Sequence, residues 1–228
     1  MKTLLYCLLL LTSLWLSGCG ATSTESPQEK KKQVLNYEKS NADYRQLVGK
    51  LLTQDATAQD FDRLLKLFPL TSYYAPRSDL EQKVKEASKT LMQKKQWIMC
   101  IRENRQLLEQ NYTSFTAHYG MAICSEEAGD SETARFHNWV LDNFIESTWR
   151  SGNGQTPETA FYINSSSDLI AFIQLHQMVG VDQELIYKDQ LPVQKVRVQN
   201  PENQRYYTWY FDMTPQFRRA YIDKIESQ

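Results

Sequence analysis

The stretch SGNGQTPETAFYI, residues 151–163, contains residue types that occur in phosphate-binding loops. Such a loop needs glycines that free backbone N–H groups, a lysine that supplies charge, and a helix that begins directly behind them. No lysine follows Gly152 and Gly154, Pro157 removes one N–H donor, and the next residues have the pattern of a strand. We therefore interpret the stretch as a turn in which one of the glycines supplies a left-handed helix stop. The side chains that remain candidates for ligand contact are Asn153, Gln155 and Glu158.

The histidines and acidic residues show no spacing typical of a metal or catalytic site. His137 and His176 fall on apolar faces of predicted helices, where histidine is more often a structural residue. His118 and His137 could approach each other across a helical hairpin. Because the sequence shows neither a histidine pair at helical spacing nor a convergent carboxylate cluster, we expect no metal ion, and we expect no cofactor. Glu158 and Asp212 leave open a carboxylate-based enzyme that acts on cell-wall or glycan material.

Two cysteines, Cys100 and Cys124, lie twelve residues on either side of Tyr112, the expected turn between two antiparallel helices. This spacing puts both thiols at the same height, so an oxidising compartment would allow a disulfide. The distance of about 8–10 Å between packed helix axes strains so short a bridge. Packing of two small unbridged side chains is therefore the slightly favoured alternative.

The N-terminal residues predict export from the cytoplasm. Lys2 precedes an apolar run from Leu4 to Leu16, which is shorter than the roughly 20 residues of a membrane-spanning helix. The sequence Leu16-Ser17-Gly18-Cys19 resembles the lipobox of bacterial lipoproteins. The resemblance implies that residues 1–18 are a signal peptide and that the Cys19 thiol and the new amino group are acylated, for example with palmitate. Acyl chains would then hold the protein on a membrane without crossing it.

The outer membrane is the expected location, because no aspartate follows Cys19 to favour retention in the inner membrane. The periplasmic face and the cell surface remain alternatives. A formal net charge of −1 over 228 residues gives no electrostatic case for nucleic-acid binding. Residues 19–39 are polar and predict a flexible tether, and residues 40–228 predict one globular domain.

Apolar residues at steps of three and four predict six helices in residues 40–149. Tyr44, Leu47, Val48, Leu51 and Leu52 mark one face of the first. Other helix signals are the cap formed by Thr57 and Asp60, the stop at Pro69, the cap at Ser78, the start at Trp97, and the turn at Gly129-Asp130.

The later helices resemble tetratricopeptide repeats, in which small residues let paired helices pack closely. Ala122 and Ala134 lie 34 residues after Ser88 and Cys100, and 34 is the period of that repeat. A generic pair of helical hairpins fits the pattern equally well. If the resemblance holds, it implies an inner groove for a peptide or protein segment, lined by Lys85, Lys89, Thr116, Tyr119, Ile123 and Glu126.

Residues 150–228 change to a mixed pattern. We expect strands at 160–163, 193–198 and 206–211, the last two forming a hairpin, and a helix capped by Ser165 through Asp168. Thr214-Pro215 should begin a closing helix that packs through Phe217, Tyr221 and Ile225. The fold class is therefore mainly helical α+β: antiparallel helical hairpins followed by a small β-hairpin or three-stranded sheet and a C-terminal helix.

The glycine loop that leads into Glu158–Phe161, and Tyr210-Phe211-Asp212 late in the chain, resemble a family of bacterial lipoproteins named domain of unknown function 4919. The segment DFDRL at Asp60–Leu64 adds weaker support. The resemblance spans most of the mature domain and implies no established activity. We therefore expect a non-catalytic binding or scaffold lipoprotein with an envelope protein or peptide as partner. An envelope enzyme or glycan binder is the alternative.

Overall fold

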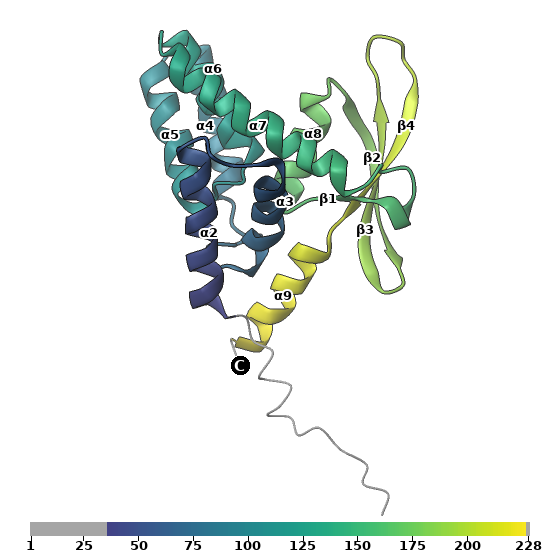
Figure 1. Ribbon diagram of the computed structural model, residues 1–228. Helices are drawn as coiled ribbons and strands as arrows, with labels where there is room; N and C mark the ends of the chain where they lie inside the picture. The colour runs from purple at the N-terminus through teal and green to yellow at the C-terminus, as the bar shows by residue number, and fades with distance from the viewer. Residues whose placement is uncertain (1–35, 227–228) are drawn as a thin grey trace, which may run out of the picture. The chain divides into compact units, whose positions relative to one another are not determined.

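The computed structural model describes residues 36–226 of the chain (Figure 1). It is a mainly helical α+β fold, as expected. The helices are α2 (Tyr37–Leu52), α3 (Ala58–Leu67), α4 (Leu80–Gln93), α5 (Trp97–Gln110), α6 (Phe115–Glu127), α7 (Ser131–Ser151), α8 (Ser166–Leu175) and α9 (Thr214–Glu226), with short 3₁₀ turns η1 (Phe68–Leu70) and η2 (Pro157–Thr159). The strands are β1 (Phe161–Tyr162), β2 (Val179–Lys188), β3 (Leu191–Gln199) and β4 (Tyr206–Asp212).

Helix α3 begins with the capping box that the sequence predicts. The Thr57 hydroxyl accepts a hydrogen bond from the Asp60 backbone N–H, and the Asp60 carboxylate accepts one from the Thr57 backbone N–H. That backbone N–H, followed by the Lys50 ammonium at 2.9 Å, lowers the pKa of Asp60 to about 2. The cap fixes the angle between α2 and α3, because Lys50 belongs to α2.

Helices α4 to α7 form two successive hairpins in which each helix packs against the next. The turn between α4 and α5 passes through Lys95 with φ of 53°, and the turn between α6 and α7 passes through Gly129 with φ of 85°. Ser88, Cys100 and the two predicted small alanines are buried at the helix contacts. The predicted helices and their small contact positions therefore occur in the structure.

Strands β1 to β4 form one sheet in the order β1-β4-β3-β2, so it has four strands rather than the expected hairpin or three strands. β1 pairs with β4 in parallel, and the other pairings are antiparallel. In Figure 1 the sheet lies to one side of the helices, and α7 and α8 run up to it. Aromatic rings fill the contact between them: Trp149, Phe161, Phe172, Trp209 and Phe211.

Strand β2 is the element that the sequence prediction missed. It is an edge strand, and most of its residues are exposed. Its pairing with β3 shifts between Gly180 and Asp182, which interrupts any simple alternation of apolar and polar residues. An exposed, irregular strand carries little of the burial pattern from which strands are predicted.

Helix α9 begins at Thr214 as predicted, but the predicted packing face is wrong. Phe217 and Tyr221 are exposed, and the side chain of Ile225 is outside the described part. The helix instead buries most of the Arg219 side chain, whose guanidinium pairs with Asp223 and donates a hydrogen bond to the Thr71 carbonyl at 2.8 Å. The Thr71 carbonyl thus accepts a hydrogen bond from the largely buried Arg219 guanidinium, which makes its burial possible. The spacing of apolar residues does not reveal such a pairing.

Candidate functional site

The predicted peptide-binding face lies on α4 and α6, which contact each other. Lys85 and Thr116 are half-buried, and the Lys85 ammonium donates a hydrogen bond to the Gln174 side chain of α8 at 3.2 Å. Helix α8 therefore covers the end of the face nearest the N-termini of α4 and α6. The residues that remain exposed are Lys89, Tyr119, Ile123 and Glu126.

A separate cavity of about 580 Å³ lies between helices α2, α5 and α7, and we refer to it as the α2–α5–α7 groove. Charged residues at its rim are Arg45, Arg105 and Glu109. Its floor is mainly apolar, formed by the aliphatic side chains Val48, Leu108 and Met121 and by the aromatic rings of Tyr44 and Phe136. A concave apolar surface with a few polar groups is the usual form of a small-molecule site.

His137 also lines this groove, and it belongs to a buried histidine pair. Its Nδ1 lies 2.9 Å from Nδ1 of His118, and Nε2 of His118 lies 2.9 Å from the Tyr112 carbonyl oxygen. The expected approach of the two histidines across a helical hairpin is therefore confirmed. The pair joins α6, α7 and the turn before α6.

Hydrogen-bond chemistry fixes the tautomers of the pair. A carbonyl oxygen only accepts, so His118 carries its proton on Nε2 and donates it to Tyr112. Nδ1 of the neutral His118 is then an acceptor, and His137 must donate to it from Nδ1. This leaves Nε2 of His137 unprotonated, on the ring edge that points away from His118. The groove is thus lined by a histidine whose free nitrogen is a hydrogen-bond acceptor.

Both histidines are held neutral by their surroundings. Burial, followed by the neighbouring His137, lowers the pKa of His118 to about 3. Burial, followed by the positive charge of Arg105, lowers the pKa of His137 to about 4. The relay of hydrogen bonds therefore persists at neutral pH, because His118 does not carry the second proton that would occupy its accepting Nδ1.

A second buried cluster joins the N-terminal ends of α4, α6 and α8. The Ser114 hydroxyl donates to the Glu81 carboxylate, and the Asp168 carboxylate accepts from the Phe115 backbone N–H at 3.2 Å and from the Ser165 hydroxyl at 3.0 Å. Burial raises the pKa of both carboxyl groups, and the charge of Glu81 raises that of Asp168 further. The partners belong to the helix ends themselves, so the cluster acts as a junction that holds three helices.

The loop at residues 151–163 is a turn, as we interpreted it, but neither glycine ends α7 in the expected left-handed conformation. Gly154 has φ of 62°, its N–H donates to the Thr159 carbonyl at 2.8 Å, and its carbonyl accepts from the Tyr210 N–H at 2.9 Å. Gly152 is extended, but a Cβ there would lie 2.4 Å from the Thr159 carbonyl oxygen. The Asn153 side chain accepts a hydrogen bond from the Thr159 hydroxyl at 2.6 Å. Gly152 therefore permits the close approach of the Thr159 carbonyl, Gly154 bonds β4 through its own carbonyl, and Asn153 is used within the turn.

Of the other loop candidates, Gln155 and Glu158 are exposed. The Glu158 carboxylate lies 3.5 Å from the Lys188 ammonium. Asp212, its proposed catalytic partner, accepts a hydrogen bond from the Thr214 N–H and lines a cavity of about 190 Å³ to which Glu158 does not contribute. The structure thus gives the two carboxylates separate surroundings.

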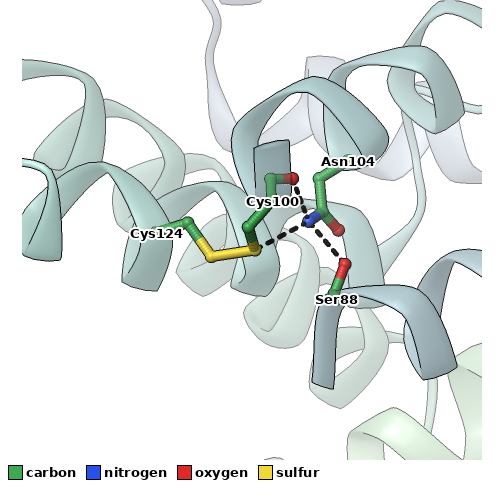
Figure 2. Close-up of a disulfide and its surroundings, with 4 residues drawn as sticks. All are labelled: Ser88, Cys100, Asn104 and Cys124. Carbon is green, nitrogen blue, oxygen red and sulfur yellow. Dashed lines mark hydrogen bonds between the residues drawn. A yellow bond between two sulfur atoms is a disulfide. The ribbon is translucent and has the colours of Figure 1, made fainter. Parts of the chain in front are cut away.

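Cys100 and Cys124 form a disulfide that links α5 to α6 (Figure 2). Their Cα atoms are 6.1 Å apart, within the range that a disulfide spans, although the sequence slightly favoured unbridged packing. The Asn104 side chain donates hydrogen bonds to the Ser88 hydroxyl and to the Cys100 carbonyl, each at 2.8 Å. Because Cα atoms lie about 2.3 Å from a helix axis, facing Cα atoms of packed helices are closer together than the axes, so ordinary packing accommodates the bridge.

The predicted lipidation site, Cys19, lies outside the described residues. Within residues 36–226, no helix has both the length and the apolar character needed to span a membrane. The same part of the chain contains no group of three or more histidine, cysteine or acidic residues placed to hold a metal ion.

Sequence reasoning did not find the α2–α5–α7 groove, because its lining comes from helices whose relative placement periodicity does not specify. One sign was available in the wide apolar face predicted for α2. Tyr44, Leu47 and Leu51 are buried in the core, whereas Val48 is half-buried and Leu52 is exposed, and both of these line the groove. The apolar face of α2 is therefore wider than the part that packs into the core, and the additional apolar residues line the groove.

The architecture defines a mainly helical α+β domain in which two helical hairpins pack beside a four-stranded sheet. Residues 28–220 match the model of the family described as Domain of unknown function (DUF4919), and the chain belongs to this family. A search among curated proteins and a search among solved structures each gave no match. The family description assigns no activity, so a function must be argued from the residues.

Proposed function

We propose that this protein is a lipid-anchored protein of the bacterial envelope that binds a peptide or protein segment without catalysis. The lipobox-like residues 16–19 support the anchor, and the outer membrane is the proposed location. The exposed part of the α4–α6 face supports binding. Tyr119 exposes 46% and Ile123 exposes 37% of its surface, and the two lie one helical turn apart on α6. This exposed pair is the observation that carries the proposal, since adjacent large apolar side chains at a surface commonly mark interaction sites.

A tetratricopeptide-like arrangement would explain why the pair lies where it does. Lys95 and Gly129 occupy equivalent left-handed turns 34 residues apart, and the buried small residues follow the same period. In such repeats the first helix of each hairpin lines the binding face, and these helices are α4 and α6 here. A bound segment would place apolar side chains against Tyr119 and Ile123, with Lys89 and Glu126 available for charge recognition.

Helix α8 limits the space available to a partner. Because Gln174 bonds Lys85, the covered end of the face is already occupied by the chain itself. We therefore narrow the proposed contact to the four exposed residues Lys89, Tyr119, Ile123 and Glu126.

Crosslinking in intact cells, followed by affinity capture and mass spectrometry, tests this proposal. The native protein is compared with a Tyr119→Ser/Ile123→Ser variant and with Ile98→Ser, which removes an exposed isoleucine from α5 as a matched control. We expect specific partners with the native chain and the control, and a loss of at least about tenfold with the double variant. Partners that survive the double substitution would exclude this face as the binding site.

A further inference from the structure

The α2–α5–α7 groove has a charge pattern suited to a monoanion. Its rim carries two guanidinium groups, Arg45 and Arg105, and one carboxylate, Glu109, so the formal charge of these groups is +1. Arg45 donates a hydrogen bond to the Tyr73 hydroxyl at 2.7 Å, which leaves other N–H groups of this guanidinium available. A single negative charge would neutralise the rim.

The histidine pair adds one position in the groove where a proton can be gained. Nε2 of His118 already carries a proton, Nδ1 of His118 accepts from His137, and Nδ1 of His137 carries the donated proton. Only Nε2 of His137 can gain a proton without breaking this relay. Arg105 opposes that gain in the empty groove, and an anion beside Arg105 would offset its charge.

We propose that the α2–α5–α7 groove binds a small aliphatic carboxylate, with its chain on the apolar floor and its carboxylate between Arg105 and His137. On binding, one proton from solvent adds to Nε2 of His137, which then donates a hydrogen bond to the carboxylate. The Nδ1–H bond to His118 and the His118 bond to Tyr112 are retained. This ligand site is distinct from the α4–α6 face and does not depend on a protein partner there.

Size and charge favour this occupant over others. The cavity of about 580 Å³ falls within the range of small-molecule sites, and its floor offers Val48, Leu108 and Met121 to an aliphatic chain. A phosphate dianion would exceed the charge of the rim and would leave the floor unfilled. A long-chain amine would meet two arginines, so a cationic amphiphile should be rejected.

Isothermal titration calorimetry of the folded protein with decanoate, decanol and decylamine tests the ligand class. Titrations at pH 7.5, 6.5 and 5.5, in two buffers of different ionisation enthalpy, count the protons taken up. We expect decanoate to bind with uptake of up to one proton and with affinity that rises by as much as about tenfold per pH unit as the pH falls. Decanol should bind more weakly and without this dependence.

Two variants separate the roles of the charged groups. Arg105→Ala should remove the preference for decanoate over decanol, because it deletes the cation beside the carboxylate. His137→Gln should abolish proton uptake, while decanoate binding that remains becomes independent of pH. Tyr187→Ser on β2, an exposed residue that does not line the groove, serves as the matched control, and its binding of decanoate should equal that of the native protein. Circular dichroism at each pH verifies that the variants are folded.

Equal affinity for decanoate and decanol, binding of decanoate without proton uptake, or absence of binding by the folded native protein would overturn the proposal. Uptake that persists in His137→Gln would also overturn it, because the proton would then bind elsewhere. Capture of protein partners through Tyr119 and Ile123 is a separate readout. A failed carboxylate titration therefore leaves the proposed function standing, and a failed capture leaves the groove proposal standing.

Discussion

His118 and His137 share a hydrogen bond that requires His118 to be neutral, and the folded protein keeps both rings neutral at pH 7. Unfolding returns each to an ordinary pKa near 6.5, whereas the folded values are about 3 and about 4. Between these limits the unfolded chain binds more protons, so the free energy of unfolding falls as the pH falls from about 6.5 toward 4. At pH 5 we expect each histidine to reduce stability by about 2 kcal/mol relative to pH 7.5. Urea denaturation at the two pH values measures this.

The carboxyls of half-buried Glu81 and buried Asp168 act in the opposite direction. Their pKa values are raised in the folded protein, so they favour the folded state at low pH and lose that contribution as the pH rises through the folded values. A comparison of the native protein with His137→Gln isolates the histidine effect, because the carboxyl contribution is common to both. The loss between pH 7.5 and 5 should be about 2 kcal/mol smaller in the variant. Identical losses would show that His137 is not neutral in the folded state.

Two helical glycines provide a matched pair for testing the contact between α5 and α6. A Cβ at Gly120 would lie 2.3 Å from Oδ1 of Asn104, whose amide group is held by Ser88 and Cys100, whereas a Cβ at Gly49 meets nothing within 4 Å. Gly120→Ala should therefore destabilise the fold by about 1–3 kcal/mol. Gly49→Ala should stabilise it by about 0.5–1 kcal/mol, because alanine restricts the unfolded chain. Thermal unfolding of both variants measures these changes in stability. An unchanged Tm for Gly120→Ala would contradict the close contact between Gly120 and Asn104.

At the level of elements, strong local signals predicted the helices well. Thr57 and Asp60 specify the start of α3, Ser165 and Asp168 specify the start of α8, and apolar steps of three and four specify the rest. Strand β2 was missed because it buries almost nothing. The face of α9 was predicted wrongly because Arg219 satisfies its charge through Asp223 and a backbone carbonyl, so apolar residues do not mark the buried side.

The disulfide between α5 and α6 encloses a segment with a sequence separation of 24 residues. Closing a loop of this length in the unfolded chain stabilises the folded state by about 3 kcal/mol in the loop-entropy model. We expect Cys100→Ala/Cys124→Ala to lower the free energy of unfolding by about 2–4 kcal/mol. The measurement is urea denaturation under oxidising conditions.

Both sulfur-bearing residues are fully buried, so a reductant should reach the bond only when the protein unfolds. Dithiothreitol should therefore bring the native protein to the stability of the double variant and leave the double variant unchanged. If dithiothreitol has no effect on the midpoint of the native protein, the thiols are not bridged in solution.

At the scale of the whole molecule, long-range contacts determine the candidate sites. The groove needs α2, α5 and α7 side by side, and the histidine relay needs α6 against α7. The Tyr44 hydroxyl accepts a hydrogen bond from the Tyr112 N–H at 2.8 Å and so fixes α2 against the turn between α5 and α6. The sequence specified the individual faces, including His118 and His137 on neighbouring helices. It did not specify which faces would enclose a cavity, because that depends on the packing of helices distant in the chain.

Membrane attachment is the property of the whole molecule that most directly tests the proposed location. Cys19 lies outside residues 36–226, the part of the chain that the structure describes. A substitution there removes the proposed acylation site and alters none of the described contacts. We expect Cys19→Ala to move the protein from the membrane fraction to the soluble fraction of lysed cells, or to leave it as an unprocessed precursor. It should also lose incorporation of a labelled palmitate analogue. The domain should keep its Tm, because its core does not include the residue proposed to be acylated. Cys7→Ala is the matched control, since it removes a cysteine inside the apolar run and should change neither labelling nor fractionation. Labelling that persists in Cys19→Ala would place the acyl group on another residue and would refute the proposed anchor.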